Sequence, residues 1–252
     1  MNQLGTLTPI NPNELAFVGL GLESGIIPWL ENGDHLRRAE FERRFDAEPE
    51  LKKAELVKGI VYMSSPVRIK KHARPHAHVM GWLFLYHAAT PGTDIGDNGS
   101  VRVDEDNLPQ PDGFLRIDEA YAGQSYIDHD DYLQNLPELV FEVASSSASY
   151  DLHEKLEMYL LHGVKEYVVW RVLENSIDWF RLEGNTYQQI RPDENGVITS
   201  TTFPGLHLAA DAFVNGNLAA VLVELQKGID SEEHKNFVAK LETQRQAKLE
   251  NP

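Results

Sequence analysis

A carboxylate and a lysine on neighbouring predicted elements are the first residues of this chain that suggest chemistry. Glu142 lies in a short apolar run, residues 139–143 (LVFEV), which predicts a strand covered on both faces. A single carboxylate in a buried strand is costly, so it requires a cation, a metal ion or hydrogen bonds. Lys155 lies beside the apolar stripe of the helix predicted next, between Leu152 and Tyr159, and points near the sheet. The pair indicates either a functional site or a structural ion pair, and these residues alone leave both interpretations open.

The segment from Pro137 to Arg171 must position this pair, and its pattern predicts strand, polar loop, helix and strand. Asp151 followed three residues later by Glu154 predicts the N-cap of the helix. Gly163 predicts its C-terminal end. Residues 166–172 (EYVVWRV) predict a second buried strand.

The composition limits the chemistry that the chain can carry out. It has 252 residues and no cysteine, so any metal site must use carboxylate, carbonyl or imidazole ligands. No run approaches the roughly 20 apolar residues of a membrane span, and the N-terminal residues lack the pattern of a secretion signal, so we expect a cytoplasmic protein without membrane contact. The net charge of −16 disfavours loose binding to nucleic acid. An enzyme acting on nucleic acid would therefore need a local basic patch or a divalent cation.

The rest of the chain predicts one domain, residues 33–228, between an irregular arm at 1–32 and a charged helical tail at 229–252. Inside the domain the hydrophobic pattern predicts helices at 35–51, 76–89 and 217–227, short strands at 55–57, 60–63, 100–103, 113–117 and 198–203, and a hairpin at 176–190.

The other polar residues in this region support no metal site by their own pattern. The spacing of His72, His76, His78 and His87 is not that of a His-Glu-x-x-His motif, so exposed or hydrogen-bonded histidines are favoured. The acidic run 94–106 lacks the spacing of a calcium loop. Asp112 stands after Pro111 at the start of a predicted strand, where a plain turn residue is the favoured interpretation.

Three features in order nevertheless match a known arrangement. Pro111-Asp112 opens a strand, Glu142 follows 30 residues later, and Lys155 comes 13 residues after that on the next helix. This order resembles the PD-(D/E)XK nuclease superfamily and, more closely, the Uma-two family of restriction endonucleases, over residues 55–208. The segments that carry the resemblance are PELVFEVASS, DLHEK, GVKEYVVW and the closing Phe-Pro-Gly-Leu element at residues 203–206.

The resemblance implies an α/β fold with a restriction-endonuclease-like core in the order αβββαβ. A mixed central sheet would be flanked by helices, with an extra C-terminal hairpin and helix. The chain departs from the superfamily pattern at Ala144, where (D/E)XK has its lysine. The resemblance implies that Lys155 takes that role from the adjacent helix.

The resemblance also implies a site. Asp112 and Glu142 would hold Mg²⁺ or Mn²⁺ together with the Val143 carbonyl, and Lys155 would orient or deprotonate a water molecule or neutralise developing charge. Glu55 would be an outer metal ligand or, equally, an ordinary surface residue. We expect the side chains of Asp112, Glu142 and Lys155 to converge in one cleft, within the ~4–6 Å over which charges strongly shift each other's pKa.

The function implied by the resemblance is a metal-dependent endonuclease that hydrolyses DNA. The alternative is a catalytically silent module for nucleic-acid or protein interaction, which the acidic net charge favours. A basic rim around the acids would favour DNA as the substrate. We also expect a homodimer, because cutting two strands suits two symmetric sites and because the apolar residues 26–29 have no place in the core motif.

Overall fold

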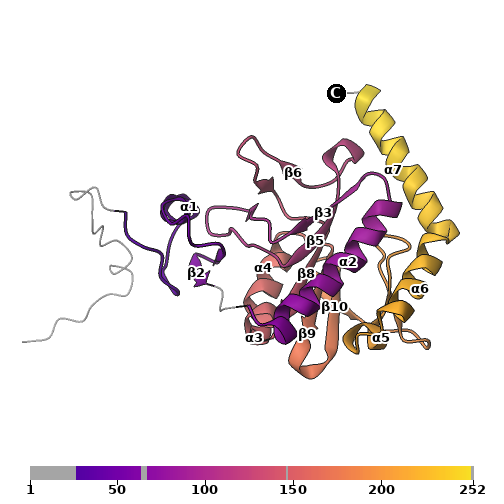
Figure 1. The fold of residues 1–252 in the computed structure, drawn as a ribbon. Helices are drawn as coiled ribbons and strands as arrows, with labels where there is room; N and C mark the ends of the chain where they lie inside the picture. Colours follow the sequence, from indigo (N-terminus) through magenta and orange to yellow (C-terminus); the bar gives the residue numbers. More distant parts are fainter. Residues whose placement is uncertain (1–26, 64–66, 146, 251–252) are drawn as a thin grey trace, which may run out of the picture.

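A mixed six-stranded sheet forms the centre of the protein (Figure 1). The computed structural model describes residues 27–63, 67–145 and 147–250. The strand order is β11-β10-β9-β8-β5-β3; β8 and β9 are parallel and the other pairs are antiparallel. Their bounds are β3 Thr93–Asp97, β5 Gly113–Ile117, β8 Leu139–Ala144, β9 Glu166–Arg171, β10 Ser176–Glu183 and β11 Thr186–Ile190.

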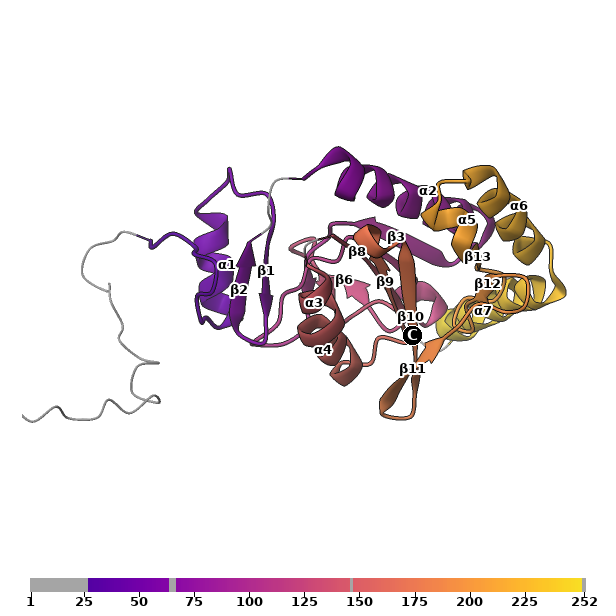
Figure 2. The ribbon, with the colours of Figure 1, turned by 90° about the horizontal axis from the view of Figure 1, so that it is seen from below.

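Helices cover both faces of this sheet (Figure 2). One face carries α2 (Arg74–Ala89), and the opposite face carries a continuous helical segment made of α3 (Ala148–Tyr150), a π-helix η4 (Asp151–Lys155) and α4 (Leu156–Leu161). The succession α2, β3, β5, β8, α4, β9 is the predicted order αβββαβ. The β10–β11 hairpin follows it, which confirms the predicted fold class.

Strand β8 shows how the sequence produces this layered arrangement. Leu139, Phe141 and Val143 pack into the core on the α2 side, whereas Val140 and Ala144 pack on the α4 side. Side chains alternate between the two faces of a strand, so Glu142 points to the α4 side. Burial of each large apolar side chain stabilises the sheet by about 1.5–3 kcal/mol, which holds Glu142 in a water-excluded strand.

A small lobe lies beside the main sheet and contributes one wall of the site. It consists of α1 (Arg38–Asp46) and the two-stranded sheet β1 (Ala54–Val57) and β2 (Ile60–Met63), and it appears at the left in Figure 1. Lys58 and Gly59 join its strands with φ of 53° and 74°, so the predicted hairpin is confirmed. The helix is shorter than the predicted 35–51 because Pro49 and its neighbours leave the helix after Asp46.

The C-terminal helices pack next to α2 (Figure 2): α5 (Ala210–Val214), α6 (Leu218–Ile229) and α7 (Glu232–Glu250). The charged tail is helical as predicted, and its Phe237 and Leu241 are buried in the main core. The predicted strand 198–203 is shorter, since β12 spans Val197–Thr199 and residues 201–205 turn before β13, His207–Ala209. None of the helices in the described residues is long and apolar enough to span a membrane.

Short elements complete the described chain. They are η2 Ile69–Ala73, β4 Val101–Arg102, η3 Glu119–Tyr121, β6 Tyr126–Ile127, β7 Leu133–Gln134 and η5 Val172–Glu174. Residues 1–26 of the expected arm, including Ile26, lie outside the described residues. Ile27 and Trp29 are exposed, while Leu30 is buried in the lobe. The homodimer and the domain limits at residues 33 and 228 stay predictions.

Candidate active site

A cleft of about 1190 Å³ lies between the small lobe, the start of α2 and the helical segment 148–161. The charged residues on its inner wall come from four separate elements: Lys53, Glu55, Asp112, Glu142, Asp151 and Lys155. The structure therefore brings Asp112, Glu142 and Lys155 into one cleft, together with Glu55 and two residues that the sequence analysis did not select for the site.

Two carboxylates meet where strands β5 and β8 part. The last residue pair between these strands is Gly113 with Phe141. Just beyond it, Asp112 Oδ2 accepts a hydrogen bond from the Val143 N–H at 2.9 Å, and Glu142 Oε2 accepts one from the Asp112 N–H at 3.4 Å. Both side chains are almost fully buried. Ending the strand pairing at this point leaves room for the two acids.

Lys155 reaches these acids from the helical segment. Its Nζ donates to Glu142 Oε1 at 2.8 Å and forms an ion pair with Glu55 Oε1 at 2.8 Å. The Tyr159 hydroxyl, one turn further on, also donates to Glu142 Oε1, at 3.1 Å. Lys155 is itself buried, so it does not extend to solvent. These contacts fall within the expected distance range.

Glu55 belongs to the interior of the site. It is buried at the lobe side of the cleft, where its Oε1 accepts the Gln110 N–H at 2.7 Å in addition to the Lys155 ion pair. This burial excludes the alternative of an ordinary surface glutamate. The alternation of strand β1 aims this side chain at the cleft.

Asp151 corrects a prediction. The helical segment starts at Ala148 with Ser147 as its N-cap, so Asp151 lies inside the helix and the predicted N-cap role is wrong. Its side chain is buried and lies 3.9 Å from Lys155 Nζ. The sequence signal that supports this position is the spacing of Asp151 and Lys155, which places the two residues on one helix face. Gly163, with φ of 77°, follows the helix as predicted.

Lys53 is the second residue that the sequence analysis missed. Its Nζ contacts Asp112 Oδ1 at 2.7 Å and the Asn98 side-chain oxygen at 2.7 Å. The side chain is 23% exposed and so stands nearer the mouth of the cleft than Lys155 does. Its position two residues before Glu55 was the available signal, because residues i and i+2 of an extended chain share a face.

Two histidines, one before α2 and one within it, contact Asp112. His72 Nε2 lies 3.2 Å from Asp112 Oδ2, and His76 Nε2 lies 2.7 Å from the Asp112 carbonyl oxygen and 3.2 Å from Asp97 Oδ1. The histidines are hydrogen-bonded, as expected, but their position beside Asp112 could not be derived from their spacing. They fix the backbone and side chain of Asp112 from the α2 side.

The electrostatic environment shifts the pKa values of the cleft acids in different directions. Burial alone would raise the pKa of Asp112, but the hydrogen bond from His72 and the charge of Lys53 outweigh it and hold that pKa well below its usual range. Burial raises the pKa of Glu142 to about 8, although Lys155 opposes this shift. Burial likewise raises the pKa of Asp151 to about 6. The pKa of Lys155 lies well above its usual value, because Glu142 and Glu55 outweigh the effect of burial, so this lysine is charged.

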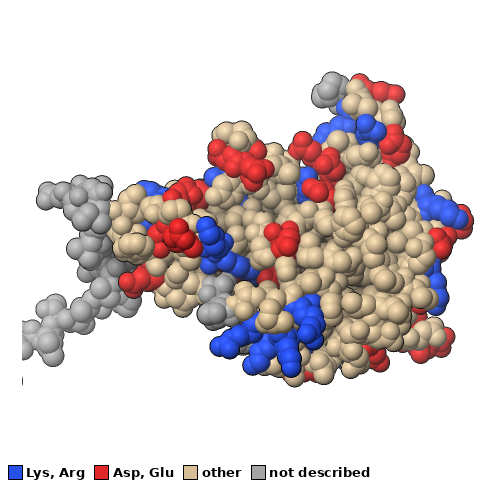
Figure 3. Space-filling model, in the orientation of Figure 1, with Lys and Arg blue, Asp and Glu red and all other residues tan. Residues whose placement is uncertain are grey.

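A basic ridge borders the cleft at the start of α2. It consists of four exposed cations, and none of them forms an ion pair with a described residue: Arg68, Lys70, Lys71 and Arg74. Figure 3 shows a group of Lys and Arg side chains at this place, where α2 begins in Figure 1. Such a rim was the feature expected to favour DNA, and in a chain of net charge −16 it is a strong local exception.

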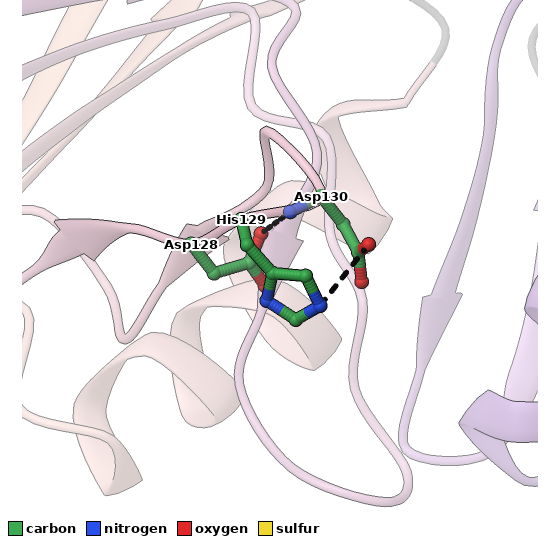
Figure 4. Close-up of side chains that lie close together, drawn as sticks. All are labelled: Asp128, His129 and Asp130. Carbon is green, nitrogen blue, oxygen red and sulfur yellow. Dashed lines mark hydrogen bonds and ion pairs between the residues drawn. The ribbon is translucent and has the colours of Figure 1, made fainter.

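A second acidic group lies on a loop (Figure 4). Among the described residues, Asp128, His129 and Asp130 are the group whose potential ligand atoms all lie within 4.8 Å of one another. Asp128 already accepts the N–H groups of Tyr132 and Asp130 and binds Arg102 at 2.8 Å. The His129 side chain is 89% exposed. These contacts explain the group as loop structure, and we assign no site to it.

The fold is that of the nuclease-like α/β proteins. The profile of the Uma-two family, described as "Putative restriction endonuclease", matches residues 38–211, and the chain belongs to this family. The predicted family is thereby confirmed, and membership supports a nuclease function.

A solved structure supports the fold assignment. It is a "putative nuclease" of the DUF820 family from Anabaena variabilis, with a TM-score of 0.52 and 12% sequence identity over 68% of this chain and 97% of that chain. At this identity the likeness concerns the fold alone. No curated protein sequence matches the chain.

Proposed function

We propose that this protein is a metal-dependent endonuclease that hydrolyses phosphodiester bonds in DNA. The observation that carries the proposal is the meeting of the Asp112 and Glu142 carboxylates at the parting of two strands, in an open cleft, with Lys155 beside them. Membership of a restriction-endonuclease family supports the reaction class. The basic ridge at the cleft margin supports a polyanionic substrate.

The donor set of the cleft fits a divalent cation. Four acids, Glu55, Asp112, Glu142 and Asp151, face two lysines, Lys53 and Lys155, so the buried site has an excess of negative charge. Oxygen ligands of this kind suit Mg²⁺ or Mn²⁺. A bound ion would offset the repulsion that helps to raise the pKa of Glu142.

The backbone of Val143 supports its proposed part in the ligand set. The Val143 N–H donates to Asp112 on the β5 side of strand β8, beyond the last pair with β5. The N–H and C=O of one strand residue point to the same side, so the Val143 carbonyl also faces the cleft. Asp112, Glu142 and this carbonyl would be the inner ligands, and Glu55 an outer one.

The residues around the proposed metal ligands have separate roles in charge neutralisation and in orienting the ligands. Bound Mg²⁺ or Mn²⁺ would supply an activated water molecule and charge stabilisation on the phosphate. Of the three roles considered for Lys155, its contacts support charge neutralisation, because a lysine that is shared by two carboxylates and has a raised pKa keeps its proton. Lys155 and Tyr159 fix the orientation of Glu142, while His72 and Lys53 fix that of Asp112.

Thermal unfolding tests the metal site directly. Metal that binds the folded site and not the unfolded chain raises stability by about 2.7 kcal/mol at 100 times its dissociation constant. We expect Glu142→Gln to be as stable as wild type in chelator, or more stable, and to lose most of the gain in Mg²⁺ or Mn²⁺. The measurement is the melting temperature of both proteins in each condition.

The catalytically silent alternative predicts a different pattern. If Glu142 serves only to pair with Lys155, Glu142→Gln is less stable than wild type in chelator, and metal changes neither protein. A plasmid-nicking assay with Mg²⁺ or Mn²⁺ then decides activity: wild type should nick supercoiled DNA and Glu142→Ala should not. Metal-dependent stabilisation without nicking would contradict the endonuclease proposal.

A further inference from the structure

The segment that carries the basic ridge has two distinct faces. Toward the cleft, His72 and His76 contact the side chain and the carbonyl of Asp112. Toward solvent and the mouth of the cleft, the same segment exposes the four ridge cations Arg68, Lys70, Lys71 and Arg74, of which the first three also line the cleft. The helical geometry of η2 and the first turn of α2 produces this division, because residues three to four apart share a face. Any ligand held on the outer face is therefore held at a fixed place relative to Asp112.

The charge of the ridge is available to a ligand. Many cations elsewhere on the described surface are paired with nearby acids, for example Lys227 with Glu224 at 2.7 Å and Lys235 with Glu232 at 2.6 Å; Arg191 and Lys240 are isolated exceptions. The ridge cations form no such pair with a described residue, so their charge is not offset locally. Four unpaired cations within one short segment match the charge density of a phosphate backbone, and guanidinium and ammonium groups bind phosphate oxygens strongly.

Apolar side chains are interleaved with these cations. Val67 and Ile69 are 63% and 67% exposed, and Leu173 of η5, the element that packs against η2, is 61% exposed. Exposed aliphatic groups between cations suit contacts with the sugar and base edges of a nucleic acid, where such side chains also act as wedges. A phosphate or small anion would leave them without a partner.

We propose that the basic ridge is the docking surface for the DNA backbone and that it sets the position of the strand relative to the carboxylates. This inference deepens the proposed function and rests on it for the choice of DNA as the ligand. The backbone lies along residues 67–74, so that a neighbouring phosphate enters the cleft beside Asp112. The ridge provides sequence-independent affinity and register, and the acids provide none.

An anionic membrane surface would also attract cations and aliphatic groups. The shape of the site favours DNA, because a single backbone can cross the ridge and enter the cleft beside Asp112, whereas a flat sheet of headgroups can contact only the exposed ridge. Binding to vesicles is therefore an outcome of the test and not part of the proposal.

The test measures binding without cleavage. Fluorescence anisotropy of a labelled 30-base-pair DNA duplex is recorded in EDTA over a series of salt concentrations, with wild type and a variant in which all four ridge cations are alanine. We expect the variant to bind DNA at least roughly tenfold more weakly. The slope of its plot of log affinity against log salt concentration should be smaller in magnitude by about 3 to 4. The double variant Lys70→Glu, Lys71→Glu changes the net charge by the same amount at only two exposed positions and should show the same direction of change, which covers a failure of the fourfold variant to fold.

The matched control removes the same number of exposed cations from α6 and α7, at Lys227, Lys235, Lys240 and Arg245. This control should bind DNA like wild type with an unchanged salt dependence. Equal effects of the ridge and control variants would show a non-specific charge effect and would overturn the inference.

The two proposals fail in different ways. If the ridge variants bind DNA with wild-type affinity and salt dependence, the docking proposal is wrong. The endonuclease proposal still holds in that case if Glu142→Ala abolishes nicking. Ridge-dependent DNA binding by a wild-type protein that cannot cut supports docking and contradicts the endonuclease. If the ridge variants lose binding to phosphatidylserine vesicles but bind DNA normally, the ridge is a membrane surface and the inference is wrong.

Discussion

The cleft acids and the loop acids of this protein differ in burial and in the partners that offset their charge. The loop acids, Asp128 and Asp130, lie closer together with His129, yet they share Arg102, backbone N–H groups and access to water. The cleft acids are Glu55, Asp112, Glu142 and Asp151; they are buried and have two lysines among four carboxylates. Burial makes each unbalanced charge costly, whereas water screens an exposed one. Excess buried charge, more than proximity, therefore marks the better candidate for a metal site.

The largest expected difference between the two groups is in cleavage. Asp112→Asn should lower Mg²⁺-dependent nicking of a plasmid by about 100-fold or more, because even residues that only support a metal ligand typically cost 10–100-fold. Asp130→Asn should leave the nicking rate unchanged. Time courses of supercoiled plasmid with both variants make the comparison. Equal losses in the two variants would remove the distinction between the cleft and the loop.

The next effect is on stability. Lys155→Met leaves Glu142 and Glu55 buried without their common cation, which should lower the free energy of unfolding by about 3–5 kcal/mol. Arg102→Met removes the partner of Glu42, Asp128 and Asp130 and should cost about 1–3 kcal/mol, since Asp130 is exposed to water and Asp128 keeps two backbone N–H donors. Urea denaturation in chelator measures both. A loss for Lys155→Met as small as that for Arg102→Met would mean that the cleft charges are hydrated.

The pH dependence of stability sharpens the comparison further. Burial raises the pKa of Glu142 from 4.5 to about 8, so the folded protein holds a proton there that the unfolded chain has lost. Stability from this group is thus fully present below pH 4.5 and is lost as pH rises to about 8. In chelator, Glu142→Gln should gain stability relative to wild type between pH 5 and pH 8, by about 1 kcal/mol or more. If the free energy of unfolding of Glu142→Gln minus that of wild type stays constant or falls between pH 5 and pH 8, the raised pKa of Glu142 is contradicted.

The smallest expected effect belongs to the loop. Asp130→Asn should change the free energy of unfolding by less than about 0.5 kcal/mol, as is usual for surface substitutions. It should also leave the stabilisation by Mg²⁺ intact. Melting temperatures with and without Mg²⁺ test both statements. A lost metal response in this variant would move the metal site from the cleft to the loop.

Local pattern was enough to predict most of the fold. The periodicities of β8, β9, the β10–β11 hairpin, α2 and α6 predicted their type and approximate bounds, because each element buries a regular set of apolar side chains. The pattern failed where tertiary contacts decide. Asp151 looks like an N-cap, but the helical segment continues three residues upstream, and the π-helix turns the side chain into the cleft.

The candidate site was predictable only in part. Asp112, Glu142 and Lys155 stand at positions that match an ordered motif, so the sequence brought them to attention. Lys53 and His72 come from segments that contact Asp112 across 59 and 40 residues. Local sequence does not predict these contacts with Asp112, because they depend on how the lobe and α2 pack against the sheet. The four cations of the basic ridge stand close together in the sequence, at 68–74, but they were not selected in advance, and their place at the cleft depends on how η2 packs.

The contact between the lobe and the helical segment determines when the site can first exist during synthesis of the chain. Lys58, in the β1–β2 turn, binds Glu154 at 2.9 Å across 96 residues, next to the contact of Glu55 with Lys155. Closing so long a loop must await the arrival of its second half. A nascent chain that ends before β9 holds Glu55 and Asp112 without a stable sheet to receive Lys155. The growing polypeptide therefore cannot complete the candidate site until the parallel strand β9 of the core has been synthesised.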